Sequence, residues 1–190
     1  MTAVWYLMRA SGVTSLVLLT IVLALGIATI KRWRFGRAPA FVTASVHRSI
    51  SLLSVAFLTI HVVTALIDPY AAVGLVAVLV PFSGSTAPLW LGLGAVSLDL
   101  VAALVVSSLL RRRIGVRAWR SIHWLAYLSW PLALAHTLGE GSDAGSSWLQ
   151  ALSATCVLTI GLTVAWRLAG RAPGKRLERQ SARPHVEVTA

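Results

Sequence analysis

Five long stretches of mostly apolar residues constrain what this chain can fold into. They are residues 11–30, 42–67, 88–110, 119–138 and 148–168. An α-helix of about 20 residues crosses the roughly 30 Å hydrocarbon core of a bilayer and satisfies its own backbone hydrogen bonds there. Of the 190 residues, 57% are hydrophobic and only 12% are charged, which excludes a soluble globular protein. The pattern predicts an all-α, multi-pass membrane helix bundle of five spans.

The positive charges are confined to three short regions. Sixteen of the 17 Lys and Arg residues lie within 31–48, 111–120 and 167–183, and Arg9 is the exception. Once five spans are drawn, the three regions fall on one side, which the positive-inside rule assigns to the cytoplasm. We therefore expect a cell-membrane protein with its N-terminus outside and its C-terminus in the cytoplasm. The net charge of +11 then reflects contact with membrane lipid, and nucleic acid is not an expected partner.

The segments outside the spans are short. Residues 1–170 are expected to form one transmembrane domain, and the basic, Pro-containing residues 171–190 a disordered cytoplasmic tail. The apolar residues 71–80 lie between two prolines and are too few to cross the membrane. They predict a re-entrant or interfacial segment on the outer side, or an ordinary outer loop. The single cysteine, Cys156, allows no disulfide within the chain and is expected to be a buried hydrophobe.

Four histidines lie within two of the predicted spans. His47 and His61 are 14 residues apart, and His123 and His136 are 13 apart, so each pair extends roughly 20 Å along a helix. Ionisable side chains at such depth are costly and suggest function. The second and fourth spans run in the same direction, so each membrane face receives one imidazole from each helix. Two ligands are too few for zinc but suit the axial positions of haem iron, which predicts two haems stacked across the bilayer.

The directions in which the histidine side chains point around each helix test this hypothesis. At about 100° per residue, His61 returns to within about 40° of the direction of His47, whereas His136 is displaced by about 140° from His123. Trp130-Pro131 lies between the latter two residues, and proline kinks or unwinds a helix. We predict that a distortion at Pro131 restores the facing, and a straight helix there would contradict this prediction.

Haem propionates require hydrogen-bond donors. Arg48, Arg117 and Arg120 lie at the cytoplasmic level and could pair with the propionates of the inner haem. Equally, they could serve only as positive-inside anchors. At the outer level no Lys or Arg is expected nearby, so propionates there would depend on hydroxyls, Tyr70, tryptophans or the backbone.

Two further residues lie near the middle of the membrane. Trp130 could lie between the haems, but core packing is the favoured interpretation. Asp99 could belong to a proton path or orient a haem ligand. A hydrogen bond between helices is the favoured alternative for Asp99.

Two segments carry a resemblance to a known family. HRSISLLSVAFLTIHVVTALIDPYA (47–71) and WRSIHWLAYLSWPLALAHTLGEGSD (119–143) resemble the ferric reductase-like transmembrane domain family, over roughly residues 12–168. That family includes the membrane domain of NADPH oxidases, metalloreductases and the haem-binding subunit of bacterial methionine sulfoxide reductase systems. The resemblance implies two b-type haems, the inner one bound by His47 and His123 and the outer one by His61 and His136. The methionine sulfoxide reductase subunits often lack one of these four positions, so the presence of all four favours two haems.

The chain also departs from the family pattern. Oxidases and reductases of the family often carry a cytoplasmic flavin and NAD(P)H domain, whereas this chain ends about twenty residues after its last predicted span and has no dinucleotide fingerprint. We therefore expect a separate flavoprotein or membrane quinol as electron donor. The expected acceptor is ferric iron, oxygen or a periplasmic protein on the outer side, which makes the chain an oxidoreductase component. The alternatives are a haem-binding membrane subunit of a partner reductase, such as a methionine sulfoxide reductase system, and a haem-free proton or ion relay.

Overall fold

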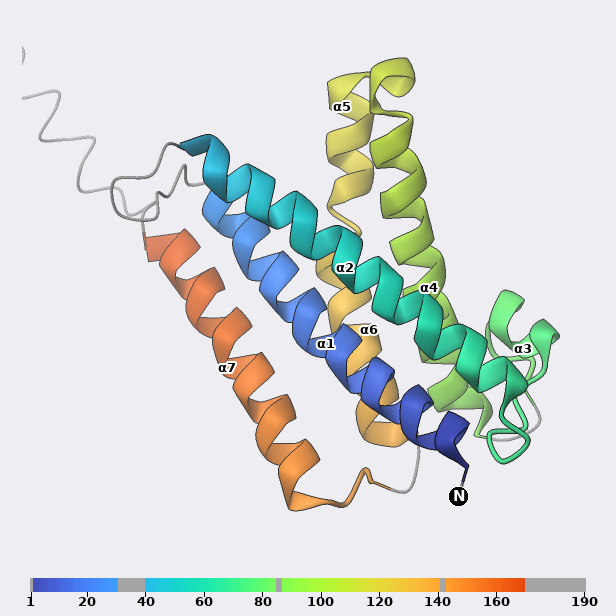
Figure 1. Cartoon of the computed structure of the whole chain (residues 1–190). Coiled ribbons are helices and arrows are strands. Elements are labelled where there is room, and N and C mark those ends of the chain that lie inside the picture. Colours follow the sequence, from blue (N-terminus) through green and yellow to red (C-terminus); the bar gives the residue numbers. More distant parts are fainter. Residues whose placement is uncertain (1, 31–39, 85–86, 141–142, 170–190) are drawn as a thin grey trace, which may run out of the picture.

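The computed structural model describes residues 2–30, 40–84, 87–140 and 143–169 (Figure 1). These residues form helices and no strands. The expected boundary at residue 170 and the tail 171–190 lie outside them. The helices in chain order are α1 (Ala3–Ile30), α2 (Ala40–Ile67), α3 (Leu75–Leu79), α4 (Pro88–Leu109), α5 (Arg111–His123), α6 (Ala126–Gly139) and α7 (Ser147–Ala169).

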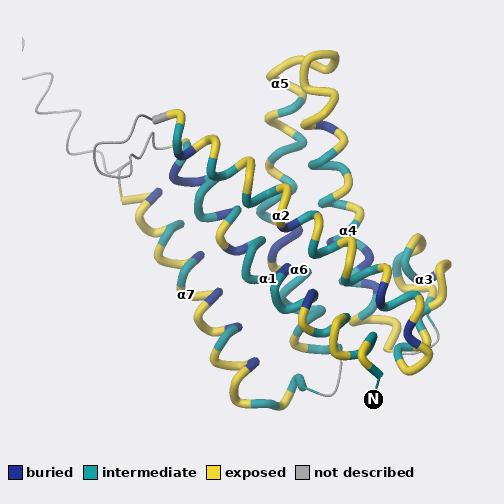
Figure 2. Tube along the Cα trace, in the orientation of Figure 1, coloured by how far each residue is buried: buried dark blue, intermediate teal, exposed yellow. Residues whose placement is uncertain are grey.

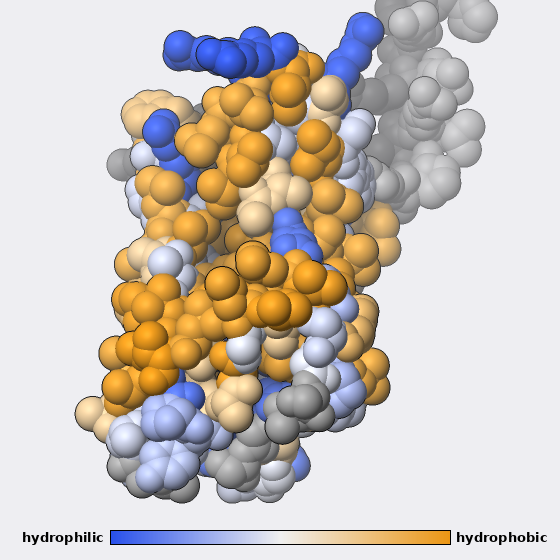
Figure 3. Space-filling model, turned by 90° about the vertical axis from the view of Figure 1, so that its right-hand side faces the viewer, coloured by the Kyte–Doolittle hydropathy of each residue, from blue (hydrophilic) through white to orange (hydrophobic). Residues whose placement is uncertain are grey.

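Four of the described helices are long and apolar enough to cross a membrane, namely α1, α2, α4 and α7. They correspond to the first, second, third and fifth predicted spans. Figure 3 shows the matching surface, a broad hydrophobic face with hydrophilic residues at the end where α4 meets α5. The prediction of a multi-pass helical membrane protein is therefore confirmed in this coarser form.

The fourth predicted span, residues 119–138, is not one continuous helix. It is divided between α5 and α6 by a turn at Trp124 and Leu125. After Leu110 the chain reverses and runs back beside α4 (Figure 1). Gly115 takes part in this reversal with a φ of 81°, a conformation that glycine adopts without steric cost. Because α6 has only 14 residues, it is too short to be a conventional span by itself.

Helix α6 continues through Pro131, so the chain is not interrupted where the distortion was predicted. The interruption comes earlier, where the N–H groups of Trp124 and Leu125 donate to carbonyls three residues back, at 3.3 and 2.9 Å. This is the hydrogen-bond pattern of a 3₁₀ turn, which winds by about 120° per residue instead of about 100°. Tyr127 and Leu128 make the same type of bond. The extra rotation accumulates between the two histidines of this segment, in the direction that brings them towards the same face.

Helix α1 is the centre of the bundle and packs against α2, α6 and α7. Its buried positions include Ser11, Ser15 and Thr20, and each hydroxyl donates to a carbonyl four residues earlier in α1. Small residues let neighbouring helix backbones approach closely in a membrane, and the internal hydrogen bonds satisfy the hydroxyls. Figure 2 shows this burial along α1, in contrast to the exposed region around α5.

The core lies where α1, α6 and α7 meet. It consists of Leu23, Trp130, Cys156 and Ile160, which are all buried. The indole N–H of Trp130 donates to the Thr20 hydroxyl at 2.9 Å, so the polar end of the tryptophan has a buried partner. The structure thereby confirms the packing role favoured for Trp130 and the burial of Cys156.

The predicted outer segment 71–80 contains only the five-residue helix α3, which packs against α4 (Figure 1). Leu75, Val76 and Leu79 are exposed, and Ala77 is buried. The re-entrant path predicted for this segment is not confirmed by this short helix.

Candidate functional site: two pairs of histidines and an outer cavity

The four histidines form two facing pairs in the described structure. The ring centroids of His47 and His123 are 6.4 Å apart, and those of His61 and His136 are 6.3 Å apart. Helix α2 supplies one member of each pair, while α5 and α6 supply the other two. The tertiary structure thus brings together the same residues that the sequence pattern paired. The distance between the two rings is almost the same in both pairs.

Three of the four imidazoles are fixed by backbone carbonyls. The Nδ1 atoms of His47, His61 and His136 lie 3.1, 2.8 and 2.9 Å from the carbonyl oxygens of residues 22, 8 and 90. A carbonyl only accepts, so Nδ1 must donate and Nε2 keeps its lone pair. This tautomer is the one that metal-binding histidines commonly adopt, with the second nitrogen held by an acceptor. The Nδ1 atom of His123, in contrast, is buried without a hydrogen-bond partner in the described structure.

The distance between the ring centroids of each pair suits two axial ligands on one iron. Two metal–nitrogen bonds of about 2 Å, with about 1 Å from each nitrogen to its ring centre, give centroids about 6 Å apart. No group of three or more His, Cys, Asp and Glu side chains that could hold a metal occurs among the described residues. A metal at either layer would therefore take its remaining ligands from a cofactor, as haem iron does.

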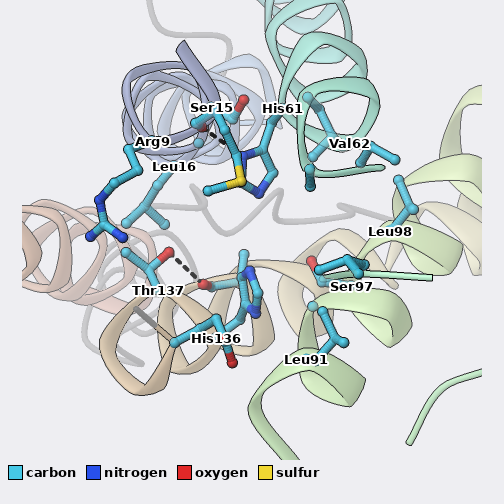
Figure 4. A pocket seen from close by; sticks show the side chains of 18 of the residues that line it. Arg9, Ser15, Leu16, His61, Val62, Leu91, Ser97, Leu98, His136 and Thr137 are labelled. Carbon is cyan, nitrogen blue, oxygen red and sulfur yellow. Dashed lines mark hydrogen bonds between the residues drawn. The ribbon is translucent and has the colours of Figure 1, made fainter. Parts of the chain in front are cut away.

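A cavity of about 400 Å³ lies at His61 and His136, which we call the outer pair after the topology that the sequence predicts (Figure 4). His61 and His136 point into it from α2 and α6 on opposite sides. Its walls are mainly apolar, with Leu16 from α1 and Leu98 from α4 among them. A mostly apolar cavity with a few convergent polar groups is the usual form of a cofactor site.

Arg9 also lines this cavity (Figure 4). The expectation that the outer level has no Lys or Arg nearby is therefore wrong. Arg9 forms an ion pair with Asp143 at 2.6 Å and lies over the ring of Trp5. In the sequence, Arg9 stands out as the one Lys or Arg outside the three charge clusters, and a lone arginine before a span is itself a signal. Tyr70, which was expected as a possible propionate partner at this level, lines the cavity as well.

Glu140 follows α6 directly and belongs to the same cavity lining. Its Oε2 atom is buried without a hydrogen-bond partner among the described residues. Partial burial raises the pKa of the Glu140 carboxyl above its usual value, because the charged form loses hydration. The cavity lining therefore includes a carboxyl that releases its proton at a higher pH than an exposed glutamate does.

His47 and His123, which we call the inner pair after the same predicted topology, have different surroundings. Arg48, Arg117 and Arg120 are all exposed on α2 and α5. The ring of Trp119 lies 4.8 Å from that of His123. The Trp119 indole thus covers one side of the imidazole that lacks a carbonyl partner.

Sequence reasoning missed Arg167, which is buried at the end of α7. Its guanidinium donates to the hydroxyl of Tyr127 and lies over the Trp124 ring. These contacts hold the 3₁₀ turn that follows His123. Its position as the first residue of the last basic cluster, still inside the apolar run 148–168, was the available signal.

Asp99 is exposed on α4 and does not line the outer cavity. The three identified Nδ1 partners of the histidines are backbone carbonyls. The ring orientation of these three histidines is thus set by main-chain atoms.

These features define a class, a helical membrane protein with two layers of facing histidines. A family model described as "Ferric reductase like transmembrane component" matches residues 11–134, and the chain belongs to this family. The matched region contains His47, His61 and His123 and ends shortly before His136. Family membership indicates a membrane redox component. Searches of curated proteins and of solved structures found no match.

Proposed function

We propose that this protein is a b-type cytochrome that moves electrons across the membrane through two bis-histidine haems. His47 and His123 would bind the inner haem, and His61 and His136 the outer one. The observation that carries the proposal is the double pairing of rings at 6.4 and 6.3 Å in two layers. The fixed tautomers of three histidines support it, because each directs a lone pair on Nε2 away from its carbonyl partner.

The proposal includes a fifth crossing formed jointly by α5 and α6. These helices run back beside α4, against which both pack (Figure 1). The arginines at the start of α5 and Arg167 then belong to the cytoplasmic side of a cell membrane, and the start of α1 to the outer side. In this arrangement α3 would lie at the outer interface.

Haem, when bound, supplies an iron that changes reversibly between two oxidation states by one electron. The chain supplies four imidazoles to hold it and an apolar cavity to exclude water. Arg9 is placed to bind a propionate at the outer level, since an arginine pairs strongly with a carboxylate. Arg48 and Arg120 are the proposed propionate partners at the inner level.

The proposed electron donor acts on the cytoplasmic side and is a separate flavoprotein or membrane quinol. The proposed acceptor lies on the outer side and is ferric iron, oxygen or a periplasmic protein. Tyr70 and Glu140, which lie just after α2 and α6 and line the outer cavity, support delivery on that side.

The test is the haem content of the detergent-purified protein, measured with a dithionite-reduced minus oxidised spectrum. We expect two low-spin b-type haems per chain. One haem would replace the proposal with an accessory haem-binding subunit of a partner reductase. No haem, after expression with ample haem supply, would overturn it in favour of a proton or ion relay.

A further inference from the structure

Three glycines lie directly against three of the paired histidines. A Cβ atom added to Gly12 would come within 2.8 Å of the His61 ring, and one added to Gly94 within 2.7 Å of the His136 ring. At Gly26 the corresponding distance to the His47 ring is 3.4 Å. Real Cβ contacts do not occur at the first two distances, so any side chain there would displace the imidazole.

Each of these glycines has the same relation to the carbonyl that holds its histidine. His61 donates to the carbonyl of Met8, four residues before Gly12. The carbonyls of Val22 and Trp90, which bind His47 and His136, likewise lie four residues before Gly26 and Gly94.

Residues i and i+4 are stacked on one face of a helix, and side chains tilt towards the N-terminus. A side chain at i+4 would therefore cover the carbonyl of residue i. Its absence leaves a notch through which an imidazole from a neighbouring helix reaches that carbonyl. We call these three arrangements the glycine notches.

The fourth histidine has no such notch. Trp90 and Gly94 are followed 14 residues later by Leu104 and Ser108, the same interval that separates Met8 and Gly12 from Val22 and Gly26. The Leu104 carbonyl accepts hydrogen bonds from the hydroxyls of Ser107 and Ser108, at 3.1 and 2.7 Å.

Ser108 in turn accepts a hydrogen bond from the Trp119 indole at 3.3 Å. The carbonyl that would match the other three is thus engaged by side chains of its own helix. The Nδ1 atom of His123 accordingly has no partner among the described residues.

We propose that Gly12, Gly26 and Gly94 are positioning residues that anchor three of the four haem ligands, and that His123 is the exchangeable ligand. This inference rests on the proposed function. The outer pair is anchored on both sides, whereas the inner pair is anchored only through His47. A small external ligand therefore replaces His123 more readily than any of the other three histidines.

The first experiment substitutes each notch glycine in the full-length chain. We expect Gly12→Ala and Gly94→Ala to lose the outer haem or convert its ferric form from low to high spin, while the inner haem stays. Gly26→Ala should have a smaller effect because its added Cβ meets the ring at an almost ordinary distance. Haem content and electron paramagnetic resonance of the ferric protein are the readouts.

Gly161→Ala is the matched control, because Gly161 lies inside α7 with nothing within 4 Å of an added Cβ. Alanine is favoured over glycine within a helix by about 1 kcal/mol, so general folding effects predict a gain rather than a loss. If Gly12→Ala and Gly94→Ala keep two haems with wild-type low-spin signals, the notches do not position ligands.

The second experiment does not depend on whether the glycine variants fold. Carbon monoxide is added to the dithionite-reduced wild-type protein, and we expect it to bind one haem per chain, the inner one. The variant His47→Ala/His123→Ala, which lacks the inner site, should bind none. Binding that persists in this variant, or binding to neither haem of the wild type, would overturn the assignment of His123.

These experiments distinguish a failure of the proposed function from a failure of the notch inference. A wild-type protein without haem defeats the proposed function itself. A wild-type protein with two haems, whose glycine variants are indistinguishable from it, defeats only the notch inference.

Discussion

Arg9 and Asp143 form an ion pair of 2.6 Å that connects α1 with the segment before α7. Their side chains are only 18% and 30% exposed, and Arg9 faces the outer cavity. The positive charge at the cavity is therefore partly compensated by a carboxylate from 134 residues further along the chain. Removing either partner leaves the opposite charge near the outer histidines.

The first prediction follows from this compensation. Arg9→Gln should lower the midpoint potential of the outer haem and Asp143→Asn should raise it, because a nearby positive charge favours the more reduced iron. A Coulomb effect of about 1 kcal/mol corresponds to about 40 mV for one electron. Redox titration followed by optical spectra measures the shifts. Arg113→Gln, at an exposed position in α5, is the control, and shifts of equal sign for Arg9→Gln and Asp143→Asn would contradict the prediction.

The second prediction concerns the pairing of ligands. His61→Ala and His136→Ala should each lose one haem, and the double variant should lose no more than one. His61→Ala/His123→Ala, which damages both pairs, should lose both haems. The number of haems per chain and the reduced spectrum are the readouts. Equal haem content in the two double variants would show that the facing rings do not share a cofactor.

The third prediction separates packing from electron transfer at Trp130. Trp130→Phe removes the hydrogen bond to Thr20 and should lower the free energy of unfolding by about 1 kcal/mol. Trp130→Ala also leaves a cavity and should cost about 3–5 kcal/mol. Unfolding in detergent, followed by circular dichroism, measures both. We expect the two haems and their rate of reduction to persist in Trp130→Phe, and a large fall in that rate would assign the residue a role beyond the core.

The fourth prediction concerns pH. Burial raises the pKa of Glu140 in the folded protein, so the folded state binds this proton more tightly than the unfolded state. The associated stabilisation is present below the unfolded pKa and is lost as the pH rises through the folded pKa. Wild type should therefore lose stability from mildly acidic to neutral pH, and Glu140→Gln should lose less. Thermal unfolding of both proteins across this range tests the prediction, and parallel pH profiles would refute it.

Much of the architecture could be predicted because the hydropathy of a segment depends only on the residues of that segment. Four of the five predicted spans appear as apolar helices. The fourth span was harder to predict, since the 3₁₀ turn at Trp124 and Leu125 is held by Arg167 and Tyr127. Arg167 belongs to another helix, so no local pattern could indicate this contact.

The sequence by itself determined that the chain is a bundle of membrane helices carrying two pairs of histidines, because the length of an apolar run and the spacing within a helix are local properties. Only the tertiary structure decided which way the imidazoles face and which carbonyls hold them. It also brought Arg9 to the outer cavity and left His123 without an acceptor. These features depend on how each helix is rotated and how closely it approaches its neighbours. Packing between residues far apart in the chain sets that rotation and approach.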